Sequence, residues 1–448
     1  MRVIILSSLF YPEIAANAKR MTDLAEALAS RGHEVAVVAA PLHRQRGAFP
    51  AISPGAPGGR EVDDHGIKIV RTFMYEPAKK TFFRRLLGVL SFALSSPFGA
   101  LRLRGRYDLL VTISPSMFSG VSASIVSGLR RIPFIFDVQD IYPETAVQLG
   151  VLKNKTLIRM ARWLERFIYQ AAAKIVVISQ GFRADITQQK GISADKVAVI
   201  PNWADTEIFR PMRGDGFKRA HGLQGKFVVM FAGNIGLAQR LRTVIEAART
   251  LRKYTDIQFV LAGEGVEKER LVQLSGAYNL KNVTFLPGRP HVEMPALLAA
   301  ADVCLVHLHK NPLGKITIPC KTYEYMAAGK PILMGASGEG KNLVEEAQCG
   351  LAFEPENPER LVEALLQLYE NRGDLARLGE NGRRYVAEKF SKGKVTADYI
   401  ELLESMAGEP LTGDLVGKGG KQRNGDPCNR RFRSRRCAAG PGVARARS

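Results

Sequence analysis

Short apolar runs alternate with longer amphipathic stretches along most of this chain. Runs such as Val3–Leu9 and Phe227–Ala232 are typical of buried strands, and stretches such as Asn17–Arg31 and Pro358–Tyr369 are typical of helices. Strands that are apolar on both faces and are separated by helices predict parallel sheets covered on both sides. We therefore expect an α/β fold.

The same pattern places the other elements. Further strands are expected at Glu34–Ala39, Ile67–Phe73, Leu109–Ile113, Phe134–Asp137, Lys174–Ser179, Gln258–Ala262, Val283–Phe285, Val303–Val306, Pro331–Met334 and Gly350–Phe353. Further helices are expected at Ile158–Ala172, Arg242–Lys253, Glu267–Tyr278, Met294–Ala299 and Tyr323–Ala328.

The strand–helix pattern restarts after Pro201–Asp205, which predicts a domain boundary there. We expect two Rossmann-like doubly wound domains at 1–201 and 206–390, facing each other across a cleft that binds ligands at the strand ends. The helix at 391–406 could pack on either domain, including by crossing back to the first. Residues 407–448 carry too few large apolar side chains for a core, which predicts a disordered basic tail.

The composition, with 46% hydrophobic and 24% charged residues, is that of a soluble globular protein. The net charge of +21 is concentrated, because segments 79–106 and 409–448 each contribute +7. The rest of the chain is nearly balanced, so we expect no nucleic-acid partner. Five widely spaced cysteines without a CxxC pair favour a reducing cytoplasm, and the first apolar run is too short for a signal peptide.

Two glycine-rich turns depart from well-known nucleotide motifs. After Gly263 and Gly265, Lys268 stands where a dinucleotide fingerprint needs a third glycine, so NAD is disfavoured. That turn is either a tight strand-to-helix connection or a loop that contacts a nucleotide. The segment 335–342 resembles a P-loop, but Asn342 cannot offer the hydroxyl that Mg²⁺ requires.

A third glycine-rich turn, 233–240, follows the first strand of the second half. Gly233 and Gly236 would let the backbone approach a ligand, and the next helix start would offer N–H groups to a phosphate. Arg240 could add positive charge.

The segment 318–331 is the most informative. A helix is expected to begin near Pro319, which suits a first-turn position, and its N-terminus would present amides to a diphosphate. Glu324 lies one turn further along, where a carboxylate can accept hydrogen bonds from ribose hydroxyls. The alternative is a capped surface helix with a solvated glutamate.

The sequence "KTYEYMAAGKPI" in this segment resembles the signature of glycosyltransferase family 4. The segments "IPNWAD", "FVVMFAGNIGLAQRL" and "IQFVLAGEGVEKERL" are similar to the same family. The segments "LFYPEIAANAKRMTDLAEALASRGHEV" and "FDVQDIYPETAVQLGVL" resemble its WbuB-like and WcaI-like branch, which builds O-antigen, capsule and colanic-acid repeat units. The resemblance spans about residues 1–405.

This resemblance implies a GT-B fold, no metal, no cofactor and retention at the anomeric carbon. The expected donor is a nucleotide diphosphate sugar, with UDP favoured and the sugar deoxy or N-acetylated. The expected acceptor is a saccharide linked to polyprenyl diphosphate, which would hold this cytoplasmic enzyme at the inner face of the membrane.

Carried over residue by residue, Glu324 matches the second glutamate of the family's paired motif, and Ile316 stands at the first. Asn234 and Gln239 stand where the wider family has a phosphate-binding arginine and lysine, and Lys321 could supply the missing charge. The donor-binding residues that we expect are Gly233, Asn234, Gly236, Gln239, Arg240, Gly263, Gly265, Pro319, Cys320, Lys321 and Glu324.

In the first half, Asp140 and Glu144 flank an Ile-Tyr-Pro turn at the end of an expected strand. Either carboxylate could stabilise an oxocarbenium-like transition state or orient the acceptor hydroxyl, or Asp140 could simply cap the next helix. Gln139 departs from the branch's usual arginine. The acceptor-binding residues that we expect are Asn17, Arg20, Pro115 and Ser116. The histidines show no metal-ligand spacing.

The segment 86–101 is apolar and has basic residues on both sides, but it is shorter than the ~20 residues that a membrane-spanning helix needs. It is either a buried domain helix or a segment that lies in an anionic membrane interface. For the interface the expected contacts are Phe82, Phe83, Arg84, Arg85 and Leu87.

Two alternatives to the transferase stay open. A nucleotide-sugar epimerase on the same fold would act without any acceptor. A non-catalytic binder of nucleic acid or membrane, driven by the basic segments, would lose affinity steeply as salt is added.

Overall fold

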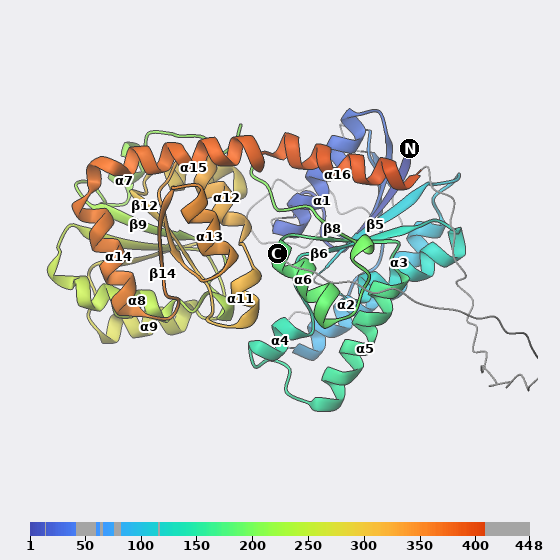
Figure 1. Cartoon of the computed structure of the whole chain (residues 1–448), viewed down its shortest axis with the longest axis horizontal. Coiled ribbons are helices and arrows are strands. Elements are labelled where there is room, and N and C mark those ends of the chain that lie inside the picture. The colour runs from blue at the N-terminus through green and yellow to red at the C-terminus, as the bar shows by residue number, and fades with distance from the viewer. Residues whose placement is uncertain (14, 42–59, 63–65, 76–81, 115–116, 408–448) are drawn as a thin grey trace, which may run out of the picture. The chain divides into compact units, whose positions relative to one another are not determined.

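The computed structural model describes residues 1–13, 15–41, 60–62, 66–75, 82–114 and 117–407. These residues form two α/β domains, each built on its own sheet (Figure 1). The predicted acceptor contacts Pro115 and Ser116, and the predicted disordered tail beyond Ala407, lie outside the described residues.

The first sheet has eight strands among the described residues. Their order is β3 (Arg60–Val62), β4 (Lys68–Arg71), β2 (Glu34–Ala39), β1 (Arg2–Ser7), β5 (Leu109–Ile113), β6 (Phe134–Val138), β7 (Lys174–Val177) and β8 (Val197–Val199). Neighbouring strands are parallel, as expected, except for β3 and β4, which form an antiparallel pair at the edge of the sheet. Too few residues separate β3 from β4 for a crossover, so the pair is antiparallel.

The strands of this sheet send alternate side chains to opposite faces. Val3 and Ile5 of β1 join a core formed with α1 (Ala16–Ser30). Ile4 and Leu6 join a core on the other face, which contains side chains of four helices. These helices are α2 (Phe82–Leu101), α3 (Met117–Arg130), α5 (Lys155–Ala171) and α6 (Gln180–Ala184).

The second sheet is wholly parallel. Its order is β11 (Val283–Leu286), β10 (Ile257–Ala262), β9 (Phe227–Ala232), β12 (Val303–His307), β13 (Ile332–Gly335) and β14 (Gly350–Phe353). The strand order reverses between β9 and β12, and in the first sheet it reverses between β1 and β5. Ligands of doubly wound sheets bind beside such switch points, at the carboxyl ends of the strands.

Helices cover both faces of the second sheet. One core contains side chains of α8 (Arg242–Thr250), α9 (Lys268–Ala277) and α14 (Pro358–Glu370), and the other those of α10 (Met294–Ala299), α12 (Cys320–Ala327) and α13 (Glu339–Glu346). The remaining helices are α4 (Glu144–Gln148), α7 (Asp215–Ala220), α11 (Pro312–Ile316) and α15 (Leu375–Lys389). Single turns occur at Asp185–Gln189, Ala194–Lys196, Leu237–Gln239, Leu251–Lys253, His291–Glu293 and Arg372–Asp374.

The last helix, α16 (Lys392–Ala407), packs on the first domain (Figure 1). Val395, Tyr399 and Leu403 are buried in the same core as β1 and α1. The Tyr399 hydroxyl donates a hydrogen bond of 3.0 Å to Asp137 at the end of β6. The sequence left open which domain this helix packs on, and in the structure it packs on the first.

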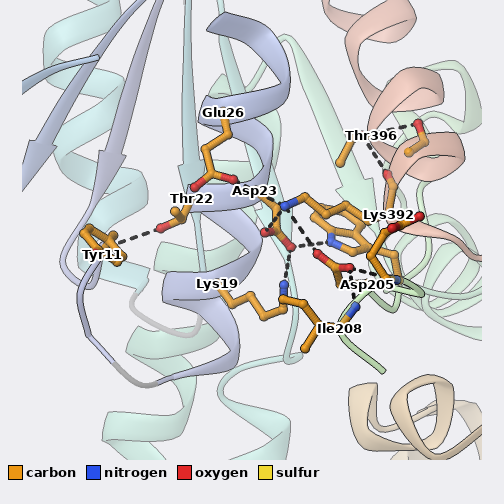
Figure 2. A network of polar contacts seen from close by, with 12 residues as sticks. Tyr11, Lys19, Thr22, Asp23, Glu26, Asp205, Ile208, Lys392 and Thr396 are labelled. Atoms are coloured by element: carbon orange, nitrogen blue, oxygen red, sulfur yellow. Dashed lines mark hydrogen bonds and ion pairs between the residues drawn. The ribbon is translucent and has the colours of Figure 1, made fainter. Parts of the chain in front are cut away.

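A charged junction holds the start of α16 in place. Figure 2 shows the Lys392 ammonium among three carboxylates, at 3.0 Å from Asp23, 3.3 Å from Glu26 and 3.6 Å from Asp205. Asp23 also accepts a hydrogen bond of 2.7 Å from the indole of Trp203. Residues from α1, the Pro201–Asp205 segment and α16 therefore meet in one network.

Replacing Leu403 by Ala tests the packing of α16. Leu403 is fully buried, so we expect the free energy of unfolding to fall by about 2–5 kcal/mol, measured by urea denaturation. The control E401A, on the exposed face of α16, should stay within about 0.5 kcal/mol of the parent protein. Equal stability of L403A and E401A would contradict the packing.

Candidate active site

The loops after β9 and β10 lie against each other. Gly233, Gly263 and Gly265 have φ angles of 133°, 150° and 157°, a region that favours glycine. A Cβ on Gly263 would collide with the carbonyl oxygen of Gly233, and one on Gly265 with that of Ile235. The packing of the two loops thus accounts for Gly263 and Gly265 without a ligand.

Lys321 lies at the start of α12, beside the loop that follows β9. Its ammonium sits 3.8 Å from the centre of the Phe231 ring, and a Cβ on Gly233 would be 2.7 Å from it. The nitrogen is buried and has no hydrogen-bond partner among the described residues. Burial lowers the pKa of Lys321 to about 8. A buried ammonium without an acceptor is costly, so this position suits an anionic ligand.

The N-terminus of α12 lies at the same position as Lys321, beside the loop after β9. Pro319 occupies the N-cap position rather than the predicted first turn, and no side chain caps the helix among the described residues. Cys320 is the first helical residue, and burial raises the pKa of its thiol to about 11. A neutral thiol and the positive end of a helix dipole leave the site electropositive.

Glu324, one turn into α12, has a partner that the sequence did not reveal. Its carboxylate lies 3.0 Å from the Nε2 atom of His291, whose ring packs edge-on against Phe209 at 5.0 Å. The carboxylate keeps partial exposure, so it can accept a further hydrogen bond. Since His291 is far from Glu324 in sequence, spacing alone could not have identified the pair.

Arg240 is held by a histidine. Its guanidinium donates a 3.0 Å hydrogen bond to the Nε2 atom of His309, whose other ring nitrogen contacts the Glu356 carboxylate. Arg240 has a left-handed φ of 44°, and its Nε atom is buried without a partner among the described residues. The side chain therefore has a donor left for a ligand.

The other residues of the 233–240 loop have structural contacts. The side-chain oxygen of Gln239 accepts a 3.1 Å hydrogen bond from the Gly236 N–H, and its carbonyl lies 2.7 Å from the Nδ1 atom of His307. Burial lowers the pKa of His307 to about 4, so this histidine is neutral. Asn234 is exposed. The expectation that Gln239 binds the donor gains no support from these contacts.

Ile316 packs against the first domain. Its side chain lies where a Cβ on Gly181 of α6 would be, and its carbonyl accepts a 2.7 Å hydrogen bond from Ser179. The Glu339 carboxylate accepts a hydrogen bond from the Gly181 N–H. The apolar residue at the family's first glutamate position therefore has a packing role.

Asp140 follows β6 and lies next to the end of β5. Its N–H donates a 3.3 Å hydrogen bond to the Ser114 hydroxyl, while its carboxylate has no partner among the described residues. Burial raises its pKa to about 6. The alternative that Asp140 caps the next helix is wrong, because α4 begins after Pro143 without a side-chain cap.

Asn17 belongs to the same group, since its amide donates a 2.8 Å hydrogen bond to the carbonyl of Ser114. Ser114 therefore joins α1, β5 and the turn after β6, whereas the sequence predicted only its neighbours Pro115 and Ser116 at this site. Asn17, Ser114 and Asp140 meet at the β1/β5 switch point, where a first-domain ligand is expected.

The structure gives Glu144 and Arg20 structural contacts instead. Glu144 forms ion pairs with Arg162 at 2.8 Å and Lys190 at 3.2 Å; burial alone would raise its pKa, but these cations bring it below its ordinary value. Arg20 is buried, bonds to Asp137 at 2.8 Å and stacks on Trp203. These contacts occupy both side chains without substrate.

The predicted membrane segment is the helix α2. No helix in the described part of the chain is long and apolar enough to cross a membrane. One face of α2 is buried through Phe92 and Ala100, whereas Leu94 and Phe98 are 72% and 68% exposed. Leu87 and Arg84 are also exposed, and the side chains of Phe82, Phe83 and Arg85 lie outside the described residues. The helix is thus a buried element with an apolar outer stripe.

Two features indicate the class of protein. Each α/β domain has a switch point in its sheet, and the second domain has an electropositive helix start. Residues 215–385 match the model of the glycosyl transferases group 1, and residues 17–203 match the glycosyl transferase 4-like domain. Together the matches span most of the chain, which belongs to this glycosyltransferase family and has its GT-B fold.

Relatives agree with this assignment. The Escherichia coli K12 protein WcaI, named as a glycosyl transferase of colanic acid biosynthesis, is 27% identical over 89% of this chain and 99% of its own. Sucrose-phosphate synthase from Thermosynechococcus elongatus superposes with a TM-score of 0.71 at 19% identity, over 91% and 99% of the two chains. Anabaena HepE, solved with UDP-glucose, gives 0.68 at 20% identity, over 90% and 100%.

Replacing Gly263 by Ala tests the loop contact. The added methyl would meet a backbone oxygen at an unfavourable φ, so we expect a loss of about 2–5 kcal/mol in the free energy of unfolding. The matched variant G276A, on α9 with open space around it, should gain up to about 1 kcal/mol from helix propensity. Thermal and urea denaturation measure both changes, and a G263A protein as stable as the parent would refute this account.

Proposed function

We propose that the protein transfers a sugar from a nucleotide diphosphate, with UDP favoured, to a lipid-linked saccharide in bacterial polysaccharide synthesis. The observation that carries the proposal is the buried Lys321 ammonium at the start of α12, which has no acceptor in the described part of the chain. The likeness to WcaI supports the pathway class, and the UDP-glucose bound by HepE supports the donor class.

In this proposal the donor diphosphate lies between the α12 N-terminus and the loop after β9. Lys321 and Arg240 supply the two positive charges that a phosphate-binding arginine and lysine supply in other members of the family. The partly exposed carboxylate of Glu324 accepts hydrogen bonds from the ribose, with His291 fixing its orientation. Among the described residues, no group of three or more His, Cys, Asp or Glu side chains is placed to hold a metal ion.

The reaction proceeds with retention. The bond between the anomeric carbon and the diphosphate oxygen breaks, and the acceptor oxygen bonds to the same face of the sugar. The acceptor proton passes to the leaving diphosphate, whose negative charge Lys321 and the α12 dipole stabilise. Asp140 accepts a hydrogen bond from the acceptor hydroxyl or stabilises the positive charge that develops on the sugar.

The acceptor belongs to the first domain, near Asn17, Ser114 and Asp140. A lipid-linked acceptor requires the enzyme to work at the inner face of the membrane. The outer stripe of α2, which includes Leu94 and Phe98, gives the first domain an apolar surface for that contact.

Transfer is tested with a panel of nucleotide sugars and a polyprenyl-diphosphate-linked acceptor, followed by mass spectrometry of the lipid. A lipid heavier by one sugar residue is expected only in the presence of the matching donor. An altered nucleotide sugar formed without acceptor would identify an epimerase and contradict the proposal.

The variant K321M tests the donor site through two opposite changes. Without UDP it should melt at a higher temperature, because a buried unpaired charge is removed. Its affinity for UDP should fall at least about tenfold, or ~1.4 kcal/mol, because the diphosphate loses its cation.

Because the pKa of Lys321 is lowered to about 8, the affinity of the parent protein for UDP should decline above that pH, and K321M should lack this decline.

The control for this experiment is K341M, which removes an exposed lysine on α13. Its melting temperature and its thermal shift with UDP should match those of the parent. If K321M bound UDP as tightly as K341M, the assignment of Lys321 to the diphosphate would be withdrawn.

The variant D140N should lose activity while becoming more stable. We expect transfer to fall at least about 100-fold, and parent activity to decline as the pH drops below about 6, where Asp140 becomes protonated. Because folding raises this pKa, the ionised carboxylate destabilises the fold above pH 6 and not below about pH 4. D140N should therefore melt higher than the parent at pH 7 and equally at pH 4.

The contrasting variant is E144Q. The pKa of Glu144 is lowered by its ion pairs, so this carboxylate stabilises the fold at pH 7 and loses that effect as the pH falls. E144Q should melt lower than the parent at pH 7. A stabilised E144Q, or a D140N with full activity, would reverse the roles given to these two carboxylates.

A further inference from the structure

The helix α5 carries an apolar stripe that faces away from the protein. Leu157, Met160, Trp163 and Phe167 are 44–69% exposed and recur every three or four residues, which places them on one face. The rings of Trp163 and Phe167 stack with their centres 6.1 Å apart. The opposite face of the helix buries Ile168 and Tyr169 in the core. We call the exposed residues Leu157, Met160, Trp163 and Phe167 the α5 stripe.

A line of basic residues runs beside the α5 stripe. Lys155, Arg159, Arg162 and Arg166 are all exposed. The single acidic residue of the helix, Glu165, is buried and paired with Lys190 at 2.7 Å. The exposed surface of α5 is thus apolar and basic, without an exposed carboxylate.

The neighbouring helices extend this character. The contact between α3 and α5, and that between α2 and α3, place the three helices next to one another on the same core (Figure 1). Ile125 and Leu129 of α3 are exposed, and neither α2 nor α3 contains an acidic residue. An anionic partner would therefore meet no acidic side chain of α2 or α3. The acidic group beside the basic line of α5 is Glu144, whose charge is paired with Arg162 and Lys190.

We propose that the α5 stripe docks on the surface of an anionic lipid bilayer. Trp163 and Phe167 enter the boundary between headgroups and acyl chains, and the basic line contacts lipid phosphates. Tryptophan and arginine beside an apolar stripe are typical of helices that lie in this interface. A second copy of the chain is disfavoured, because a two-fold contact would bring the same basic lines together.

This inference rests on the proposed function, since a lipid-linked acceptor gives the first domain a reason to bind membrane. It adds a second contact that is separate in sequence from the one on α2. Docking through both helices would hold the face that carries α2, α3 and α5 against the bilayer.

The two tryptophans of the chain make the proposal testable. Trp163 is 69% exposed, whereas Trp203 is 6% exposed and donates a hydrogen bond to Asp23. A change in emission on adding vesicles therefore reports on α5. With phosphatidylcholine vesicles that contain phosphatidylglycerol, we expect a blue shift and quenching by brominated acyl chains. With phosphatidylcholine alone, both should be much weaker.

The variant M160S/F167S keeps Trp163 as the probe and should need at least about tenfold more lipid for half-maximal sedimentation. The control M212S/V272S removes two apolar residues of similar exposure elsewhere and should bind like the parent. All variants keep the basic residues beyond 407, so charge in that segment does not bias the comparison.

Three outcomes would overturn the proposal. Sedimentation with vesicles without a change in Trp163 emission would place the contact elsewhere. Unchanged binding by M160S/F167S would do the same, and a blue shift that follows protein concentration without lipid would identify self-association. The measurement uses no nucleotide sugar, so a failure here is distinct from a failure of the transfer assay.

Discussion

The buried ammonium of Lys321 is the constraint on which the proposed donor site depends. It has the Phe231 ring and the α12 start around it and no acceptor among the described residues. Gly233 leaves the space next to this ammonium, and Gly263 lets the loop after β10 lie against the loop after β9. Burying this ammonium has a desolvation cost, which a bound diphosphate would offset. The positive charge is thus preorganised for the ligand.

The first domain separates two carboxylates that are close in sequence. Among the described residues, no cation pairs with Asp140, and burial raises its pKa. The charge of Glu144 is balanced by Arg162 and Lys190, and its pKa is lowered. Contrasting environments of this kind distinguish reactive carboxylates from structural ones. Arg20 and Lys392 have a different task, because their contacts fasten α1, the interdomain segment and α16 together. In the proposed mechanism, reactivity and rigidity therefore belong to separate side chains.

Much of the fold could be predicted because its signal is local. Five predicted elements, among them Phe227–Ala232 and Met294–Ala299, have the observed bounds, since a buried strand or an amphipathic helix is visible in a short window. The antiparallel β3 and the short β8 were not predicted, because three-residue strands at a sheet edge have little periodicity. The α5 stripe was also not recognised, because the period of an amphipathic helix does not say which of its apolar residues are buried.

The sequence by itself determined the two-domain α/β pattern, the family signature and the candidate groups at the ends of the strands. The tertiary structure decided which of those groups are free to act. Among the described residues, the Asp140 carboxylate and the Lys321 ammonium have no hydrogen-bond partner, whereas Arg20 and Glu144 form ion pairs. The pairing of Glu324 with His291 joins residues from different elements. The physical reason is that secondary structure follows from neighbouring residues, whereas desolvation and ion pairing depend on groups that only the folded chain brings together.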